Sequence, residues 1–313
     1  MTRPRRPAPP WQQARDALHR RTAHLPPTVR GLLWSAAAGL IFSVLNALMR
    51  ALALHLDPFQ AQFLRYMFGL LVLLPLVAHS RSLRAWWPRS VRGQFIRGAL
   101  HTAGLVLWFW ALPRIPLADM TAIGFTGPLF IMVGAWLFFK EPMHWERWLA
   151  VGLGFAGVLI VVGPKLSIGH GGGGLWHLVM LGSAPLFAAS FLVTKALTRY
   201  ETAGTILLWQ AITVTLLSLP LPGWQAPTPW QWAGFLACGV LGSAGHYCLT
   251  RSYQVADISS TQSAKFLDLL WSALMGWFLF SDLPTASTLL GGVVIATATL
   301  WVARREARRR PTN

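Results

Sequence analysis

Long apolar stretches follow one another along this chain, and they restrict its fold more than any other feature. Each is about twenty residues long, enough for a helix to cross a hydrocarbon core about 30 Å thick. Only 12% of the residues are charged, about half the share of an ordinary soluble domain. We therefore expect an all-α integral membrane protein with ten transmembrane helices, at residues 31–54, 59–78, 94–112, 118–139, 147–163, 175–197, 203–221, 230–251, 256–280 and 285–303.

The lysines and arginines are unevenly distributed, and their distribution predicts the orientation. With the N-terminus inside, most of the 27 fall in cytoplasmic segments and only Arg114 and Lys165 fall outside. We expect a multi-pass protein of the cell inner membrane, in contact with the lipid bilayer, with both termini cytoplasmic in basic tails at 1–30 and 304–313. The arginines flank apolar runs instead of lining a soluble face, so the net charge of +17 does not indicate a nucleic-acid partner.

The two halves of the chain resemble each other. Residues 118–142 and 256–284 both begin Ala-Asp and end with an aromatic residue, a carboxylate and a proline. Five spans per half is an odd number, so the halves must insert with opposite topology, as in the inverted repeats of secondary transporters. We expect a first five-helix repeat at 31–168 and a second at 175–303. The glycine-rich stretch at 169–174 is expected to be a linker, because no Gly-Lys-Ser/Thr follows it as in a phosphate loop.

Two segments carry a family resemblance. Residues 42–76, "FSVLNALMRALALHLDPFQAQFLRYMFGLLVLLPL", and residues 265–282, "KFLDLLWSALMGWFLFSD", resemble spans one, two and nine of EamA-type carriers of the drug/metabolite transporter superfamily. The resemblance implies two inverted five-helix repeats, a central substrate cavity and alternating access. Two features depart from that family: Ser281-Asp282 replaces a common Gly-Glu pair, and a proline common within span nine is missing, although Pro128 holds the matching place in span four.

Two opposite charges lie in the middle of the predicted ninth span. A charge at the centre of a membrane helix costs about 2.5–3.5 kcal/mol on insertion scales. Lys265 and Asp268 are three residues apart and so lie on one helix face, where each can partly neutralise the other. They form either a structural ion pair or a cavity-facing pair that contacts substrate or relays a proton. We favour the functional interpretation, with Trp271 adding an aromatic surface on the same face.

Other polar and aromatic residues inside the spans are further candidates for the substrate site. Arg65 could pair with Asp268, cap backbone carbonyls or bind an anionic substrate group. The remaining candidates are Asn46, His101 and His246, each either a helix–helix hydrogen bond or a site group; Pro128, a kink or a cavity-lining break; and Trp108. Trp108 and Trp110 fit an aromatic belt at the membrane interface better than a substrate surface, but if either faces inward, Trp108 is the better cavity candidate. The histidines could also titrate and couple transport to protons. Arg50 and Arg97 lie close to predicted helix ends, and we expect both to extend to the membrane interface.

The leading functional hypothesis is a secondary active transporter that moves a small organic metabolite by alternating access. The mixed charges and tryptophans suit a zwitterionic or aromatic substrate, such as an amino acid or a cofactor-like compound. A membrane-embedded enzyme is the first alternative, but the sequence has no HExxH or paired-aspartate motif, so we predict no catalytic residue, metal or cofactor. A non-transporting receptor or assembly subunit is the second. The expected partners are the small-molecule substrate and a coupling proton or exchange substrate, in a monomer or homodimer.

Overall fold

The structure is a computed structural model of the 313-residue chain. It leaves undescribed residues 1–24, 54–55, 79–82, 112–122, 125, 143, 163–172, 220–223, 262–263, 266, 281–285, 287–288, 295–296, 298–300, 302–303 and 306–313. The predicted linker at 169–174 and most of the two basic tails therefore lie largely or wholly outside the described residues.

Every regular element in the described part of the chain is a helix, which confirms the expected all-α class. The long helices are α2 (Pro27–Ala53), α3 (Pro58–Ala78), α4 (Val91–Ala111), α6 (Gly127–Phe139), α7 (Trp145–Val162), α8 (Gly173–Leu197), α9 (Ala203–Leu217), α10 (Pro229–Val255) and α12 (Leu267–Phe280). The short ones are η1 (Leu83–Trp86), a 3₁₀-helix, and α11 (Ile258–Thr261).

Three helical stretches in the described part are long and apolar enough to cross a membrane, judged by length and composition. They are Pro27–Met49, Phe59–Ala78 and Leu178–Leu197. The apolar stretches Phe130–Phe139 and Ala203–Leu217 are shorter. The count of ten spans and their inverted arrangement therefore stay predictions.

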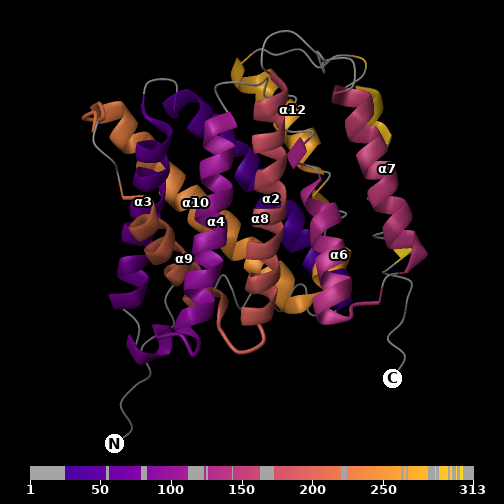
Figure 1. Cartoon of the computed structure of the whole chain (residues 1–313), viewed down its shortest axis with the longest axis horizontal. Coiled ribbons are helices and arrows are strands. Elements are labelled where there is room, and N and C mark those ends of the chain that lie inside the picture. The colour runs from indigo at the N-terminus through magenta and orange to yellow at the C-terminus, as the bar shows by residue number, and fades with distance from the viewer. Residues whose placement is uncertain are drawn as a thin grey trace, which may run out of the picture.

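The helices form a bundle whose centre is built from both halves of the sequence. Helix α10 packs against α2, α3 and α9, and α4 packs against α8 and α9. Helix α7 stands at the edge of the bundle (Figure 1). Because the central contacts join the first half of the chain to the second, a site in the middle of the bundle draws its side chains from both.

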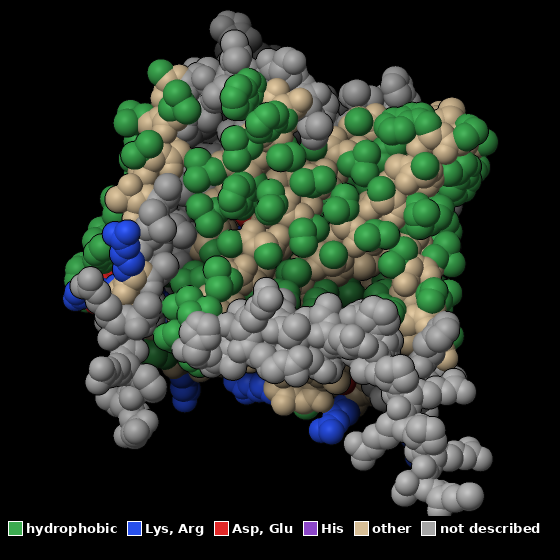
Figure 2. All heavy atoms as spheres, turned by 180° about the vertical axis from the view of Figure 1, so that it is seen from behind, with side chains coloured by type: hydrophobic (Ala, Val, Ile, Leu, Met, Phe, Trp, Pro, Cys, Tyr) green, Lys and Arg blue, Asp and Glu red, His purple; other side chains and the backbone are tan. Residues whose placement is uncertain are grey.

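The outer surface is apolar, as expected of a chain that lies in lipid. Hydrophobic side chains cover most of the described face in Figure 2, and lysine and arginine side chains lie near its lower and left margins. Some of the largest apolar side chains are the most open, including Phe138 at 76% and Phe278 at 70% exposure. Such a continuous exposed apolar surface marks a membrane-facing region in preference to a soluble one.

The predicted ninth span, 256–280, is wrong as a single helix. Helix α11 ends at Thr261, Ala264 and Lys265 form a 3₁₀ turn, and α12 begins at Leu267. The hydroxyl groups of Ser260 and Thr261 donate to the carbonyls of Asp257 and Ile258, each three residues earlier, at 2.8 Å. Such local side-chain bonds compete with helical backbone bonds, which gives a physical reason for a break without proline or glycine.

Pro128, considered as a kink or as a cavity-lining break, lies at the start of a helix and not inside a continuous one. Helix α6 begins at Gly127 with Thr126 before it, and Pro128 falls in its first turn. Proline is tolerated there because the first backbone N–H groups of a helix have no intrahelical partner. Helices α6 and α12 come from matching segments of the two sequence repeats, and both begin well inside their predicted spans. Each repeat therefore contains a helix that begins within its predicted span and not at the end of that span.

Candidate functional site

The charged pair predicted from the sequence is present at the break before α12. Lys265 Nζ lies 3.5 Å from Asp268 Oδ2, and the side chains are 15% and 27% exposed. Lys265 belongs to the 3₁₀ turn and Asp268 to the first turn of α12. A carboxylate in the first turn is also stabilised by the positive end of the helix dipole.

Asp268 packs directly against α2 at Gly39. A Cβ atom added at Gly39 would overlap Asp268 Oδ1 and would approach Trp271 Cδ1 to 3.5 Å. Asp268 Oδ1 and Trp271 Nε1 are both buried, and neither has a hydrogen-bond partner among the described residues. A buried polar atom without a partner is destabilising, so an acceptor and a donor are available here for a bound molecule.

Phe42 joins this pair to a second polar cluster. Lys265 Nζ lies 5.5 Å from the centre of the Phe42 ring, within the range of a cation–π contact. On its other side, the Phe42 ring meets the His246 ring edge to face, with 4.9 Å between centres. One aromatic side chain of α2 therefore links the break before α12 to α10.

The second cluster brings the two predicted histidines together around a tyrosine. Tyr66 Oη lies 2.8 Å from His101 Nε2 and 3.5 Å from His246 Nε2, and the two histidine rings are 5.4 Å apart. Gln210 Nε2 is 3.4 Å from His246 Nε2. The histidines therefore act as hydrogen-bonding links between helices α3, α4, α9 and α10, which was one of the two roles considered for them.

Arg97 does not extend to the membrane interface, so that expectation is wrong. The side chain is 2% exposed and its guanidinium donates to Thr194 Oγ1 at 2.5 Å, to the Ile206 carbonyl at 3.0 Å and to Gln210 Oε1 at 2.6 Å. All three acceptors are neutral. They come from α8 and α9, about a hundred residues further along the chain, so a sequence pattern local to Arg97 cannot reveal them.

Arg65 does not pair with Asp268, whose ionic partner is Lys265. The Arg65 guanidinium lies over the Tyr66 ring, 5.1 Å from its centre, and has no hydrogen bond or ion pair with any described residue. It borders a small pocket between α3, α9 and α10 with a volume of about 10 Å³, enough for about one water molecule. The pocket is lined by Arg65, Tyr66, Gly69, Leu207, Gln210, Ala211, Gly239, Gly242, Ser243 and His246.

Asn46 and Trp108 lie outside the contacts described so far. Asn46 is exposed and makes no side-chain hydrogen bond with a described residue, so the helix–helix role considered for it is not seen. It lies one turn after Phe42, on the same face of α2. Trp108 packs against the hydrophobic core, whereas Trp110 is 46% exposed, so of these two tryptophans it is Trp108 that faces inward.

A separate set of contacts ties the two halves together at the end of the bundle where α6 and α8 finish. Glu141 Oε1 accepts from the Ile258 backbone N–H at 3.2 Å, and Arg147 lies 3.6 Å from Asp257. Within the second half, Lys195 of α8 donates to two carbonyls at the end of α10, those of Tyr253 at 2.8 Å and Ala256 at 2.7 Å.

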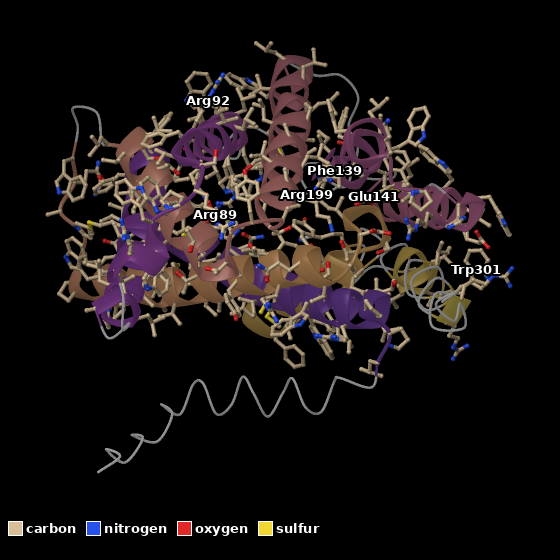
Figure 3. All side chains as sticks on the ribbon, turned by 90° about the horizontal axis from the view of Figure 1, so that it is seen from below. Arg89, Arg92, Phe139, Glu141, Arg199 and Trp301 are labelled. Atoms are coloured by element: carbon tan, nitrogen blue, oxygen red, sulfur yellow. The ribbon has the colours of Figure 1, made fainter. Side chains whose placement is uncertain are left out.

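Figure 3 looks onto this same end of the bundle. It shows Phe139, Glu141 and Arg199 near one another, and Arg199 lies 5.3 Å from the centre of the Phe139 ring. The sequence comparison of the two halves singled out Glu141 only as a repeat marker. In the sequence, the position of Glu141 directly after a predicted membrane helix was a signal that it could join the two halves at this end.

The comparison with known proteins now decides the family. A family model described as EamA-like transporter family matches residues 29–163 and again residues 174–304. The chain belongs to the EamA-like transporter family. This confirms the resemblance noted in the sequence and the expectation that the chain is a multi-pass membrane transporter and not an enzyme.

Several relatives of this EamA-like transporter carry functional names. The chain is 33% identical over 288 residues to a riboflavin transporter of Rhizobium johnstonii, covering 90% of this chain and 93% of the relative. It is 28% identical over 282 residues to an S-adenosylmethionine uptake transporter of Rickettsia bellii, with 89% and 94% covered. It is 27% identical over 282 residues to a pseudopaline exporter of Pseudomonas aeruginosa, with 88% and 96% covered.

The fold is also that of a solved structure. A crystal structure of a protein only 17% identical matches with a TM-score of 0.75, covering 89% of this chain and 98% of the other. At that identity the match shows the shared fold alone.

Proposed function

We propose that this protein is a secondary active transporter that carries a small aromatic or cofactor-like metabolite across the inner membrane by alternating access. The observation that carries the proposal is the break before α12. It holds Lys265 and Asp268 against α2 and leaves Asp268 Oδ1 and Trp271 Nε1 without a hydrogen-bond partner among the described residues. Substrate sites of secondary transporters typically lie at such discontinuous helices near the bilayer midplane.

Both sequence repeats contribute to the proposed cavity. Lys265, Asp268, Trp271 and His246 come from the second repeat, and Phe42 comes from the first. A ligand held between them would contact both halves of the bundle, so a relative movement of the halves would change its access. The contacts of Glu141 and Arg147 at the end of α6 and α8 support this mechanism, because they join the halves at the end that we assign to the cytoplasm.

Charge narrows the substrate class. Three cations, Arg65, Arg97 and Lys265, lie around the two polar clusters. Among the described residues, the carboxylate in this region is that of Asp268. Such an arrangement disfavours a substrate with a net positive charge, because like charges repel strongly where water is scarce. Among ring compounds like those named for the relatives, we therefore favour a neutral or anionic one, as riboflavin is neutral, over the sulfonium compound S-adenosylmethionine.

The proposal includes an energy source other than ATP, since the sequence has no Gly-x-x-x-x-Gly-Lys-Ser/Thr motif. An ion gradient or exchange against a second metabolite would drive uphill movement. We place both termini in the cytoplasm, on the strength of the lysine and arginine distribution.

The decisive experiment is uptake of a mixed metabolite pool, including riboflavin, into proteoliposomes, read out by mass spectrometry with and without a pH gradient. We expect a ring compound to accumulate with the wild-type protein and not with Lys265→Ala or Asp268→Asn. Arg92→Gln is the matched control, since Arg92 is exposed near the start of α4. Normal uptake by both variants would contradict the proposed site. Binding without uptake in the wild-type protein would favour the receptor alternative.

A further inference from the structure

Arg65 is a charged group inside a predicted span that has no hydrogen bond or ion pair with a described residue. Its guanidinium has five N–H donors, and among the described residues it contacts only the face of the Tyr66 ring. Arg97, by contrast, has acceptors for all three of its guanidinium nitrogens. Charged groups buried in a membrane protein are typically paired or functional.

The pocket beside Arg65 is rich in hydrogen-bond donors and contains no carboxylate. Its polar lining comes from three helices: Arg65 and Tyr66 from α3, Gln210 from α9, and Ser243 and His246 from α10. The described carboxylates outside the α12 break are bound elsewhere. Asp57, for example, accepts from Phe59 N and Gln60 N at the start of α3, and Glu201 accepts from the Arg89 and Ser90 backbones. No described protein group therefore neutralises Arg65.

Glycines keep this pocket open next to the guanidinium. A Cβ atom added at Gly242 would lie 3.5 Å from Arg65 Nε and 3.9 Å from Arg65 Nη2. The pocket therefore has room for about one oxygen atom next to the guanidinium, whose N–H groups donate to the oxygens of a carboxylate or phosphate.

We infer that the pocket between α3, α9 and α10 binds an anionic oxygen group, a carboxylate or a phosphate, of the transported compound. One oxygen of the group accepts from the Arg65 guanidinium in the pocket, where the Gln210 amide lies on the same lining. The ring of the compound then extends past His246 and Phe42 towards Lys265 and Asp268. This inference rests on the proposed transport function and narrows its substrate class from neutral or anionic to anionic.

The test uses two pairs of probes that differ mainly in charge: riboflavin and riboflavin 5′-phosphate, and benzamide and benzoate. Thermal unfolding of the purified full-length protein is followed in nanodiscs of zwitterionic lipid as each probe is titrated. In the wild-type protein we expect at least one anionic probe to bind about tenfold or more tightly than its neutral partner. Arg65→Gln should abolish that preference, while Arg65→Lys should keep part of it.

Two further variants separate this pocket from a general loss of folding. Gly242→Ala keeps Arg65 and adds one methyl group at ordinary contact distance, so the fold should tolerate it while anion binding weakens. Arg251→Gln, at the far end of α10, should leave the preference unchanged. A parallel arm adds phosphatidylglycerol to the nanodiscs, because a lipid headgroup also offers a phosphate.

The outcomes are distinct. Equal affinity of the wild-type protein for charged and neutral partners, or an unchanged preference in Arg65→Gln and Gly242→Ala, overturns the inference. Stabilisation by phosphatidylglycerol alone also overturns it, since the source would then be lipid. If neutral riboflavin is taken up and this uptake depends on Lys265 and Asp268, the proposed transport function holds and the proposed anion-binding pocket is wrong.

Discussion

Single residues in this protein show two ways of keeping a charge inside a membrane bundle. Arg97 is surrounded by neutral oxygens that accept all its directed hydrogen bonds, whereas Lys265 relies on one carboxylate and one aromatic ring. Each guanidinium nitrogen of Arg97 thus already has a protein acceptor, and no ligand is needed to satisfy it. The second, with Asp268 Oδ1 unpartnered, is incomplete without a bound molecule, so we assign structure to Arg97 and substrate contact to Lys265 and Asp268.

Arg97→Lys should lower stability although it keeps the charge. A lysine ammonium cannot reach Thr194, the Ile206 carbonyl and Gln210 in the geometry of a planar guanidinium. We expect a loss of about 2–4 kcal/mol, seen as a clear fall in the midpoint of thermal unfolding in detergent. Arg92→Lys at an exposed position is the control and should change the midpoint little. Equal midpoints for the two variants would show that Arg97 is not a structural anchor.

The Lys265–Asp268 pair predicts a non-additive pattern of stability. Lys265→Met leaves the Asp268 carboxylate uncompensated, and because the pair is partly exposed we expect a loss of about 1–3 kcal/mol, less than for a fully buried pair. The double variant Lys265→Met/Asp268→Asn should recover much of that stability while uptake stays lost. A double-mutant cycle of thermal unfolding measures the coupling; strict additivity would argue against a direct interaction.

At the level of helices, the break between α11 and α12 and the close approach of α2 create the site together. Gly39 allows the Asp268 carboxylate to lie against the α2 backbone, and Ser35 Oγ donates to the Thr261 carbonyl at 3.3 Å, at the end of α11. The two half-helices are thus held by the same face of α2.

Gly39→Ala tests this packing. The added methyl group would overlap Asp268 Oδ1, so α12 or the carboxylate must shift, and we expect uptake to fall at least tenfold. Gly152→Ala in α7 is the matched control, because nothing lies within 4 Å of a Cβ atom there. The measurement is initial uptake in proteoliposomes at equal protein incorporation. Normal uptake by Gly39→Ala would mean that the position of Asp268 is not critical.

For the molecule as a whole, the contacts of Glu141 and Arg147 join segments from both repeats at one end. In an alternating-access cycle these contacts must form and break as the halves move. The exposed Asn46 provides a position at which access can be followed, since it lies on the face of α2 that carries Phe42.

Weakening the contacts at this end should change access to the cavity. We expect Glu141→Ala, which loses the bond to the Ile258 N–H between the two halves, to reduce labelling of an Asn46→Cys variant by a membrane-impermeant thiol reagent added outside. Cys238 and Cys248, the free cysteines, are first replaced by serine. Unchanged labelling beside a fully folded Glu141→Ala variant would argue against a gate at this end.

Much of the architecture was predictable because it depends on local patterns. The lengths of the apolar runs predicted an all-helical membrane protein, and the family motifs predicted a transporter of the EamA type. The i, i+3 spacing alone predicted that Lys265 and Asp268 would meet, as they do at 3.5 Å. Those features need only the period of a helix and the thickness of a bilayer.

The tertiary structure decided what depends on residues far apart in the chain. Packing buried Arg97, joined His101 to His246 through Tyr66, and broke the ninth span before α12. It also left Arg65 without a hydrogen bond or ion pair among the described residues. Hydrogen-bond acceptors for a buried charge can come from any neighbouring helix, and helix spacing says nothing about which helices are neighbours. The sequence therefore determined which residues could be functional, and only packing determined which of them are already satisfied and which are left to bind a ligand.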